Sequence, residues 1–381
     1  MARWIWRSDL GSVLAAVLTG CTGNADMYQH LCGSPSFSTF GLSSGGEGLS
    51  ATGDAQGNFW FPEVERVDFA NSSPMFKRLP DAIARVAPDQ SVTEFDVEAP
   101  LAGGIAIDSD GNAWFTMSTG PSGVSSLGRL TPSGDLTMRP LSREACATPP
   151  CLDPPYDVMG RAMAAGPDGK VWFAEGNSRL ATQGRITRIE TLSEAVDRFQ
   201  IASSSVSDMV AGPDGNVWLM GDFWTLQEAY IARATPDGDV TVFRLDGQIA
   251  TERMTFGPDG NLWYTYHSTG SGDRELLLGR MNLQGETSTP IRLPHDLYPP
   301  HPIAAGRDGK LWIGAADKLI CATEDGQIGT VAVPVPDDPR PDIPRPLICF
   351  GGMEGGSDGH LWLTTSSECF FAGLVVRVEI E

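Results

Sequence analysis

Short runs of alternating large and small or polar side chains follow one another along most of the chain, separated by turns rich in Gly, Pro and Asp. The run at 261–264, for example, comes directly after a Pro-Asp-Gly turn at 258–260. Alternation with a period of two is typical of a β-strand, and Gly after Asp supplies the positive φ of a tight turn. No repeated segment carries a sustained 3.6-residue apolar stripe. The pattern therefore predicts an all-β protein.

The turn and the strand after it recur seven times, each copy carrying a Trp, with steps of 45 to 58 residues between successive tryptophans. These are Trp60, Trp114, Trp172, Trp218, Trp263, Trp312 and Trp362. A short apolar run precedes each turn, and two further strand-like runs follow it. Four short strands per unit at this period predict a seven-bladed β-propeller with four-stranded blades, because a β-helix coil is shorter. We expect each Trp to pack between adjacent blades.

The two ends of the repeat array are complementary. The run at 375–380 is the third strand of the last unit, and no fourth strand follows it. The run at 37–42 has the pattern of an outer strand, but no unit precedes it. We expect 37–42 to complete the last blade, which closes the ring and removes exposed strand edges. Residues 36–381 then form one propeller domain.

Arginine recurs at one position of the third strand in six of the seven units. These residues are Arg85, Arg129, Arg185, Arg233, Arg280 and Arg377, and Cys321 takes the position in the sixth unit. Such recurrence predicts a structural Arg that covers apolar surface or pairs with a turn carboxylate. The Asp-Gly turns, including Asp108 and Asp110, lack the twelve-residue ligand ladder with a terminal Glu. They are interpreted as turns rather than calcium sites.

The first residues differ from the rest of the chain. Arg3 and Arg7 precede an apolar run at 13–18 that is too short to span a bilayer, so residues 1–20 are predicted to be a secretory signal. The run Leu-Thr-Gly-Cys at 18–21 is similar to a bacterial lipobox, in which the Cys, here Cys21, is lipidated and becomes the mature N-terminus. An ordinary signal cut nearby and a mis-set start codon are the alternatives. Residues 21–35 are interpreted as a tether.

Cysteine usage supports export to an oxidising compartment, either as a lipoprotein of the bacterial cell envelope or as a secreted protein. Of seven cysteines, setting Cys21 aside for lipid leaves an even six. We expect two disulfides, one joining Cys146 to Cys151 and one joining Cys349 to Cys369. Cys32 and Cys321 remain as the third pair.

The net charge of −21 argues against nucleic acid or an anionic membrane surface as a partner, so contact with a membrane is expected only through the N-terminal lipid. We expect a monomer that binds a small molecule or a peptide. Two insertions, at 62–80 and 142–157, emerge on the same face of the predicted propeller. Because insertions collect on the binding face of repeat proteins, the mouth of the central channel on that face is the expected site.

The unit Gly-Pro-Asp-Gly-Asn-Leu-Trp at 257–263, together with Gly-Arg-Ile-Thr at 184–187, resembles the virginiamycin B lyase (streptogramin lyase) family, and the resemblance covers residues 37–381. NHL-type and sugar-lactonase-like propellers are more distantly similar. The resemblance implies a secreted or cytosolic seven-bladed propeller that linearises a cyclic depsipeptide by elimination. In such a reaction a histidine base removes a proton and Mg²⁺ stabilises the developing negative charge.

The family's functional positions are only partly matched. Pro300-His301-Pro302-Ile303 matches the Pro-His-x-Ile context of the family's first histidine, whereas the second corresponds to Gly351. The family's metal-binding Glu corresponds to about Ser366, and Glu368 two residues later is the candidate metal ligand. One of three positions is therefore retained.

Five residues are candidates for the mouth of the channel. His301 begins an inner strand there, and His267 lies at the top of the neighbouring blade; with Glu252 they could form a metal or acid–base cluster. Arg161 and Glu252 occupy the same inner-strand position as His301 and are expected to line the mouth. Glu175, three residues past Trp172, is a further binding candidate at a family position that is usually structural.

Two hypotheses of function follow. The first is ligand recognition at the channel mouth, since polar residues are kept there but the family's catalytic set is not. The second is a metal-assisted carbon–oxygen lyase or hydrolase with a rearranged site that uses His301 and His267. The second hypothesis requires these two histidines to converge within about 5 Å of one another, close to the width of a shared coordination sphere.

Overall fold

The computed structural model describes residues 31–380 apart from several internal stretches. These are 43–46, 49, 65–66, 69–76, 79, 118–125, 142–155, 178–183, 194, 202–204, 224–227, 246, 248, 269–274, 295–300, 335–348 and 367–373. In the described residues every regular element is a strand. No helix in this part of the chain is long and apolar enough to cross a membrane.

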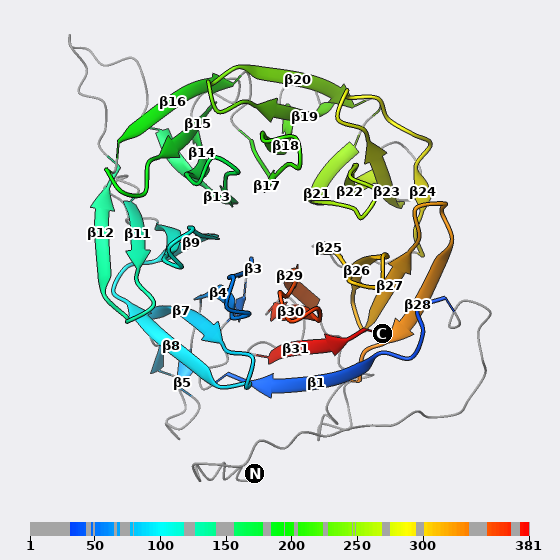
Figure 1. Ribbon diagram of the computed structural model, residues 1–381, viewed down its shortest axis with the longest axis horizontal. Coiled ribbons are helices and arrows are strands. Elements are labelled where there is room, and N and C mark those ends of the chain that lie inside the picture. Colours follow the sequence, from blue (N-terminus) through cyan, green and yellow to red (C-terminus); the bar gives the residue numbers. More distant parts are fainter. Residues whose placement is uncertain are drawn as a thin grey trace.

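Seven antiparallel sheets stand around a central axis as the blades of a propeller (Figure 1). The blades are numbered 1 to 7 in chain order, and each leads from an inner strand at the axis to an outer strand at the rim. The inner strands are β3 (Thr52–Gly53), β9 (Leu101–Ile107), β13 (Tyr156–Ala165), β17 (Asp208–Ala211), β21 (Ile249–Phe256), β25 (Ile303–Ala305) and β29 (Cys349–Gly355). The second strands are β4 (Phe59–Val64), β10 (Ala113–Met117), β14 (Val171–Asn177), β18 (Val217–Phe223), β22 (Leu262–Ser268), β26 (Leu311–Ala315) and β30 (Leu361–Ser366).

The third strands are β7 (Asp81–Val86), β11 (Ser126–Leu130), β15 (Gly184–Ile189), β19 (Glu228–Ala234), β23 (Leu276–Met281), β27 (Lys318–Ala322) and β31 (Leu374–Glu379). The outer strands are β8 (Val92–Val97), β12 (Leu136–Pro140), β16 (Val196–Ile201), β20 (Val240–Leu245), β24 (Ile291–Arg292), β28 (Ile328–Ala332) and, in blade 7, β1 (Ser36–Gly41). Blade 1 carries a further short inner segment, β2 (Glu47–Gly48), which also pairs with β4. A small hairpin, β5 (Val67–Asp68) and β6 (Lys77–Arg78), lies outside the blades.

The ring closes as the sequence predicts. Strand β1 pairs antiparallel with β31, with Phe37 opposite Val378 and Phe40 opposite Val375. The N-terminal strand therefore supplies the outer strand of blade 7 (Figure 1). Because one blade is built from both ends of the domain, the ring has no unpaired first or last blade.

The repeated turn and its Trp form the core between blades. All seven repeat tryptophans are at most 2% exposed. In every blade the indole N–H donates to the carboxylate of the turn Asp, at 2.7 to 3.4 Å. The turn glycines, such as Gly260, have positive φ, as the sequence pattern requires. These Asp-Gly loops are therefore structural turns, and the prediction of a core Trp is confirmed.

Arginine stacks on the Trp of six blades, with its guanidinium carbon 5.2 to 5.7 Å from the ring centroid. In blade 3 the stacked residue is Arg188, so the sequence-based choice of Arg185 was wrong. Two arginines three residues apart occur in this strand, and the register sets Arg188 opposite Trp172. Arg185 lies opposite Glu175 instead. In blade 6 Cys321 takes the position opposite Trp312, as expected.

A disulfide joins Cys32, which precedes β1, to Cys321 on β27, with the two Cα atoms 5.6 Å apart. It ties the segment that leads into blade 7 to blade 6, and it confirms the pair that cysteine counting left over. Cys349 is also disulfide-bonded. Its predicted partner Cys369 lies outside the described residues, as do Cys146, Cys151, Cys21 and the predicted signal.

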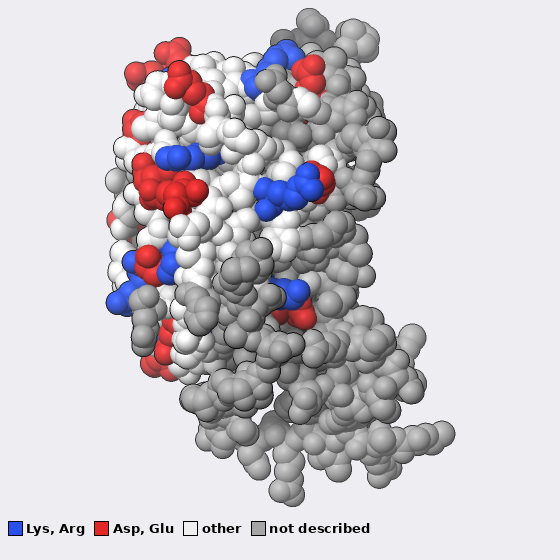
Figure 2. Space-filling view, turned by 90° about the vertical axis from the view of Figure 1, so that its right-hand side faces the viewer, with Lys and Arg blue, Asp and Glu red and all other residues white. Residues whose placement is uncertain are grey.

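Charges of both signs are interspersed on the described part of the face shown in Figure 2. The net charge of −21 is therefore not gathered into one acidic field on that face.

Candidate functional site

Blades 5 and 7 carry a β-bulge at the same place in their inner strands. The register slips between Thr251 and Arg253 in β21, and between Phe350 and Gly352 in β29. Glu252 and Gly351 are thus the extra residues. A bulge re-aims the side chain it carries, and bulges are frequent beside active sites. His301, two residues before Ile303, holds the equivalent position in blade 6.

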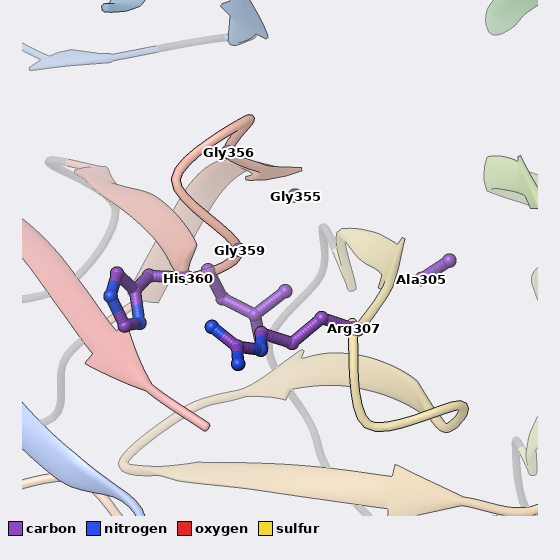
Figure 3. Close-up of a pocket in the computed structure, with 8 residues that line it drawn as sticks. Ala305, Arg307, Gly355, Gly356, Gly359 and His360 are labelled. Carbon is purple, nitrogen blue, oxygen red and sulfur yellow. The ribbon is translucent and has the colours of Figure 1, made fainter. Parts of the chain in front are cut away.

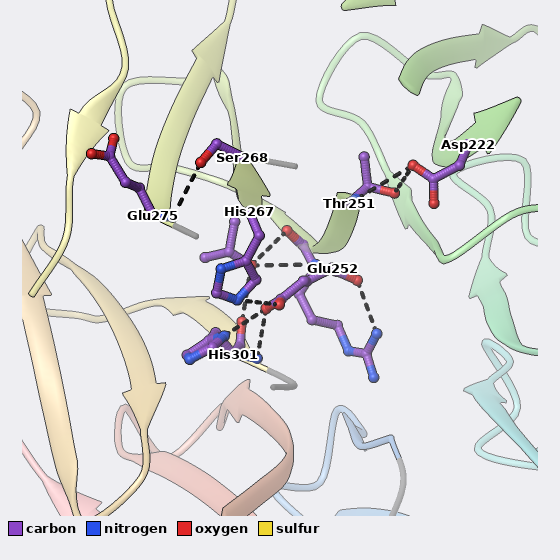
Figure 4. Close-up of polar contacts among 9 residues, drawn as sticks. Asp222, Thr251, Glu252, His267, Ser268, Glu275 and His301 are labelled. Atoms are coloured by element: carbon purple, nitrogen blue, oxygen red, sulfur yellow. Dashed lines mark hydrogen bonds and ion pairs between the residues drawn. The ribbon is translucent and has the colours of Figure 1, made fainter. Parts of the chain in front are cut away.

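Glu252, His267 and His301 converge at the junction of blades 5 and 6 (Figure 4). Glu252 Oε2 accepts a hydrogen bond from the His301 backbone N–H at 2.9 Å and lies 2.7 Å from His301 Nδ1. Glu252 Oε1 lies 2.9 Å from His267 Nε2, and the two imidazole centroids are 5.2 Å apart. One ligand atom from each residue can be chosen so that all three lie within 4.8 Å of one another.

The backbone around this cluster is held by Thr265 of β22, which is fully buried. Its hydroxyl donates to the His301 carbonyl at 3.0 Å and accepts from the Arg253 N–H at 3.3 Å. His267 lies two residues further along the same strand, opposite Ala250. Thr265 therefore links the backbone beside Glu252 to the backbone of His301.

The cluster is buried, with exposures of 8% for Glu252, 3% for His267 and 0% for His301. Burial alone would raise the pKa of Glu252, but hydrogen bonding and charge from His267 and His301 outweigh it and hold that pKa well below its usual range. Glu252 is therefore an anion facing two imidazoles. His267 Nδ1 is buried and has no hydrogen-bond partner among the described residues, so it is a polar atom that a ligand could satisfy.

A polar network continues from the cluster toward blade 4. Asp222 Oδ1 lies 3.2 Å from Thr251 Oγ1, which in turn lies 3.0 Å from Ser207 Oγ. Burial raises the pKa of Asp222, and the hydrogen bonds from Thr251 oppose that rise. Thr251, the neighbour of Glu252, is thus hydrogen-bonded to a second carboxyl, that of Asp222. Sequence reasoning missed Asp222.

A third carboxyl of interest belongs to blade 7. Burial, together with the nearby charge of Asp208, raises the pKa of Glu354 to about 7. Asp208 itself accepts a hydrogen bond from the Met254 N–H at 2.8 Å. The two inner-strand carboxyls Glu252 and Glu354 therefore have pKa values shifted in opposite directions.

The position of the family's second histidine cannot hold a side chain in this chain. A Cβ built on Gly351 would lie 1.7 Å from the carbonyl oxygen of Gly48 in β2. That carbonyl is fixed by a hydrogen bond from Thr364 Oγ1 at 3.0 Å. The residues present at this junction therefore do not fit the Mg²⁺ site that the family resemblance implies.

The remaining sequence candidates are distributed as follows. Glu175 is 3% exposed and its Oε2 lies 2.6 Å from Arg185 Nε, so its charge is neutralised within blade 3. The backbone of Arg161 lies in β13, but its side chain is outside the described part, as is that of Ser366. Glu368 is also outside it. Among the candidates, the structure brings together Glu252, His267 and His301.

Sequence reasoning missed the threonines that position the site. Thr116, Thr265 and Thr364 each lie two residues after the repeat Trp, and each hydroxyl accepts from an inner-strand N–H of its own blade. Aligning the seven units on their tryptophans would have revealed this recurrence.

A separate hollow of about 220 Å³ lies between the turns that follow β25 and β29 (Figure 3). Arg307 and His360 line it together with glycines of both turns. It lies at the opposite end of β25 from His301, so it is not part of the cluster described above.

Several solved structures are similar to this chain at low sequence identity. A gluconolactonase from Xanthomonas campestris is 16% identical, with a TM-score of 0.44 over 80% of this chain and 91% of that one. A protein of unknown function from Dyadobacter fermentans is 12% identical, with a TM-score of 0.48 over 90% and 98%. A protein of unknown function from Bacteroides caccae is 13% identical, with a TM-score of 0.41 over 66% and 90%.

Among curated proteins, none matches the sequence. The profile of the virginiamycin B lyase family, in contrast, matches residues 77–338, which include the whole of blades 2 to 6 and all three residues of the cluster. The match extends over more than half of the chain and coincides with the propeller repeat. The chain belongs to the virginiamycin B lyase family.

Proposed function

We propose that this protein is a metal-assisted carbon–oxygen lyase or hydrolase that acts on an ester bond at the channel mouth. The observation that carries the proposal is the convergence of Glu252 from β21, His267 from β22 and His301 from the segment that leads into β25. The imidazole centroids are 5.2 Å apart, close to the separation that the enzymatic hypothesis requires. The site keeps His301, which matches the family's first histidine, but takes its other two residues, Glu252 and His267, from blade 5.

Two imidazoles and one carboxylate are a ligand set suited to Zn²⁺ or a similar transition metal, whereas Mg²⁺ prefers oxygen ligands. Ligands of a tetrahedral zinc ion with bonds of about 2 Å are roughly 3.3 Å apart. The three side chains, whose ligand atoms lie within 4.8 Å of one another, would need only small rotations to meet this spacing. An ion held there would polarise an ester carbonyl.

The same side chains offer a second chemistry in which no ion takes part. Glu252 lies within hydrogen-bonding distance of His301 Nδ1 and so orients that imidazole, as carboxylates do for a general-base histidine. The two chemistries differ in their response to a chelator, which abolishes the first and leaves the second unchanged.

Ligand recognition without turnover is the second candidate function. The burial of the cluster favours it, since His301 is 0% exposed and an ion enclosed to that degree could serve stability alone. In this case the mouth would bind a small molecule or a peptide, and the cluster would hold the inner strands of blades 5 and 6 together.

We propose in addition that the protein is exported and anchored by lipid at Cys21, and that it acts as a monomer. The lipobox-like run at 18–21 and the Cys32–Cys321 disulfide support export, because disulfides persist in oxidising compartments. Replacing Cys21 with Ser should abolish lipid labelling and release soluble protein. Lipid labelling that survives this change would contradict the proposal.

The test of the enzymatic proposal uses a panel of lactones, linear esters and cyclic depsipeptides with Zn²⁺, Co²⁺ or Mg²⁺. We expect turnover with Zn²⁺ or Co²⁺ that a chelator abolishes and that His267→Ala and His301→Ala both lose. His360→Ala, which changes the hollow at the far end of the blades, is the matched control and should retain it. Mass spectrometry of the product separates hydrolysis, which adds water, from elimination, which does not. Metal binding without turnover of any ester would favour recognition instead.

A further inference from the structure

Arg253, the residue after Glu252 in β21, is a cation directly beside the cluster. Its Nη1 donates to the Glu252 carbonyl at 2.9 Å, whereas its Nη2 is buried with no hydrogen-bond partner among the described residues. In that part of the chain Arg253 takes part in no ion pair. A buried guanidinium N–H without a partner is costly, and a ligand that accepts from it would recover that cost.

The other strand arginines are used differently. Arg280, for example, lies over Trp263 at 5.2 Å and its Nη2 is 2.6 Å from Asp259 Oδ2. The same stacking recurs in six blades. These arginines belong to the structural repeat, but Arg253 does not.

The backbone at this position does not require an arginine. In blades 2 and 7 the equivalent residues are Gly104 and Gly352, whose N–H groups donate to a threonine hydroxyl as that of Arg253 does. At Gly352 a Cβ would lie 2.9 Å from the backbone of Ser50, so that junction has no room for a side chain. A long cationic side chain is therefore a particular feature of blade 5, directly beside the cluster.

We propose that Arg253 binds the carboxylate group of the substrate or product at the channel mouth, so that the site takes carboxylate-bearing organic anions. The inference rests on the proposed function for its chemistry. In an ester elimination a base takes the α-proton, its C–H electron pair forms the new double bond, and the C–O pair leaves with a carboxylate. In ester hydrolysis water adds to the carbonyl carbon, and the products are an alcohol and a carboxylate. Both reactions end with a carboxylate.

A guanidinium is suited to this role because its fork of N–H donors matches the two oxygens of a carboxylate, and charge-assisted hydrogen bonds are among the strongest in proteins. The single donation to the Glu252 carbonyl orients the side chain and uses one of its five N–H groups. In the elimination, Arg253 would stabilise the negative charge that develops on the leaving carboxylate, and in hydrolysis it would bind the carboxylate product.

The experiment measures binding of benzoate and of its neutral analogue benzamide by calorimetry, with Zn²⁺ and again with EDTA. We expect benzoate to bind and benzamide to bind at least about tenfold more weakly. Arg253→Gln should weaken benzoate binding by at least about tenfold and remove the preference over benzamide, whereas Arg253→Lys should retain part of both. Arg292→Gln removes the same charge from an exposed pair on β24, and binding should not change.

Equal binding of benzoate and benzamide by the natural chain, or benzoate binding unchanged in Arg253→Gln, would overturn the proposal. A purely structural Arg253 would lower the melting temperature when replaced but leave the preference for benzoate intact, which also overturns it. If benzoate binding depends on Arg253 but no metal ion binds, the carboxylate site stands while the proposed metal-assisted function fails. If zinc binds but benzoate does not, the carboxylate site at Arg253 is rejected and the proposed metal-assisted function is not.

Discussion

The junction between blades 5 and 6 and the junction between blades 7 and 1 have the same backbone arrangement. They differ in the side chains that they hold. In both, an inner strand bulges, and a threonine of the second strand donates to a carbonyl of the next blade. At the first junction the bulge carries Glu252, whose carboxylate reaches His301. At the second it carries Gly351, which lies directly against the backbone of Gly48.

The difference follows from how the ring closes. The blade that contains Gly351 takes its outer strand from the N-terminus, and the next segment of that chain, β2, then passes over the bulge. Backbone fills the space in which the family resemblance places a histidine. Among the described residues, no such segment passes between blades 5 and 6, and the same position holds side chains there. A functional group can thus disappear from one junction and be assembled at another without changing the fold.

The largest expected effect comes from adding a side chain at the junction of blades 7 and 1, called the closed junction because backbone fills it. Gly351→His should lower the free energy of unfolding by more than about 4 kcal/mol, because the new Cβ meets backbone that cannot move aside. Urea denaturation measures the change. Gly41→Ala is the control, since nothing lies within 4 Å of the added Cβ there. A stable Gly351→His protein with new lyase activity would show that the junction can open.

The junction of blades 5 and 6, called the open junction, should lose stability when the charge of Glu252 is removed. Glu252→Gln should cost about 3–5 kcal/mol near neutral pH, because the buried carboxylate that contacts both imidazoles and the His301 N–H is lost. The folded pKa of Glu252 is lowered, so its contribution is present above the ordinary carboxyl pKa and is lost as the pH falls below it. Denaturation at several pH values should therefore show the cost shrinking in acid. A loss of stability in Glu252→Gln that does not vary with pH would contradict the conclusion that Glu252 is ionised in the folded protein.

The disulfide should matter for the closed junction and not for the open one. Cys32→Ser should lower stability by about 2–4 kcal/mol, because the segment leading into β1 is no longer tied to blade 6. Metal affinity at Glu252, His267 and His301 should stay within a factor of about two, since distant sites behave independently. Urea denaturation of the Cys32→Ser variant measures the stability, and titration calorimetry with Zn²⁺ measures its metal affinity. A large loss of metal affinity would mean that the two junctions are coupled.

The smallest effect concerns Glu354, whose pKa of about 7 lies above its ordinary value. Its folded form holds a proton that the unfolded chain releases, so stability falls as the pH rises from about 4.5 through 7. Glu354→Gln should remove this penalty and stabilise the protein by about 1–2 kcal/mol at pH 8, with little effect at pH 4.5. Melting curves at the two pH values measure it, with the outer-strand change Glu94→Gln as control. Equal effects at both pH values would argue against the raised pKa.

The propeller and its core tryptophans could be predicted because the same pattern recurs seven times along the sequence. The closure could be predicted because the last unit lacks an outer strand and the N-terminal segment supplies one. The arginine of blade 3 could not be assigned correctly from spacing alone, since Arg185 and Arg188 both fit the pattern until the register is known. The cluster of Glu252, His267 and His301 was foreseen only as one option, because nothing in the sequence fixes the approach of neighbouring blades. The contact of Gly48 with Gly351 joins residues some 300 positions apart and leaves no local signal.

The most direct test of the central claim is the binding of one Co²⁺ or Zn²⁺ ion at the junction of blades 5 and 6. Calorimetry should give one ion per chain. The X-ray absorption spectrum of the cobalt protein should show two imidazole ligands. Binding should be lost in His267→Ala and in His301→Ala but kept in His360→Ala. Binding that persists in both of the first two variants, or no binding by the natural chain at neutral pH, would contradict the account.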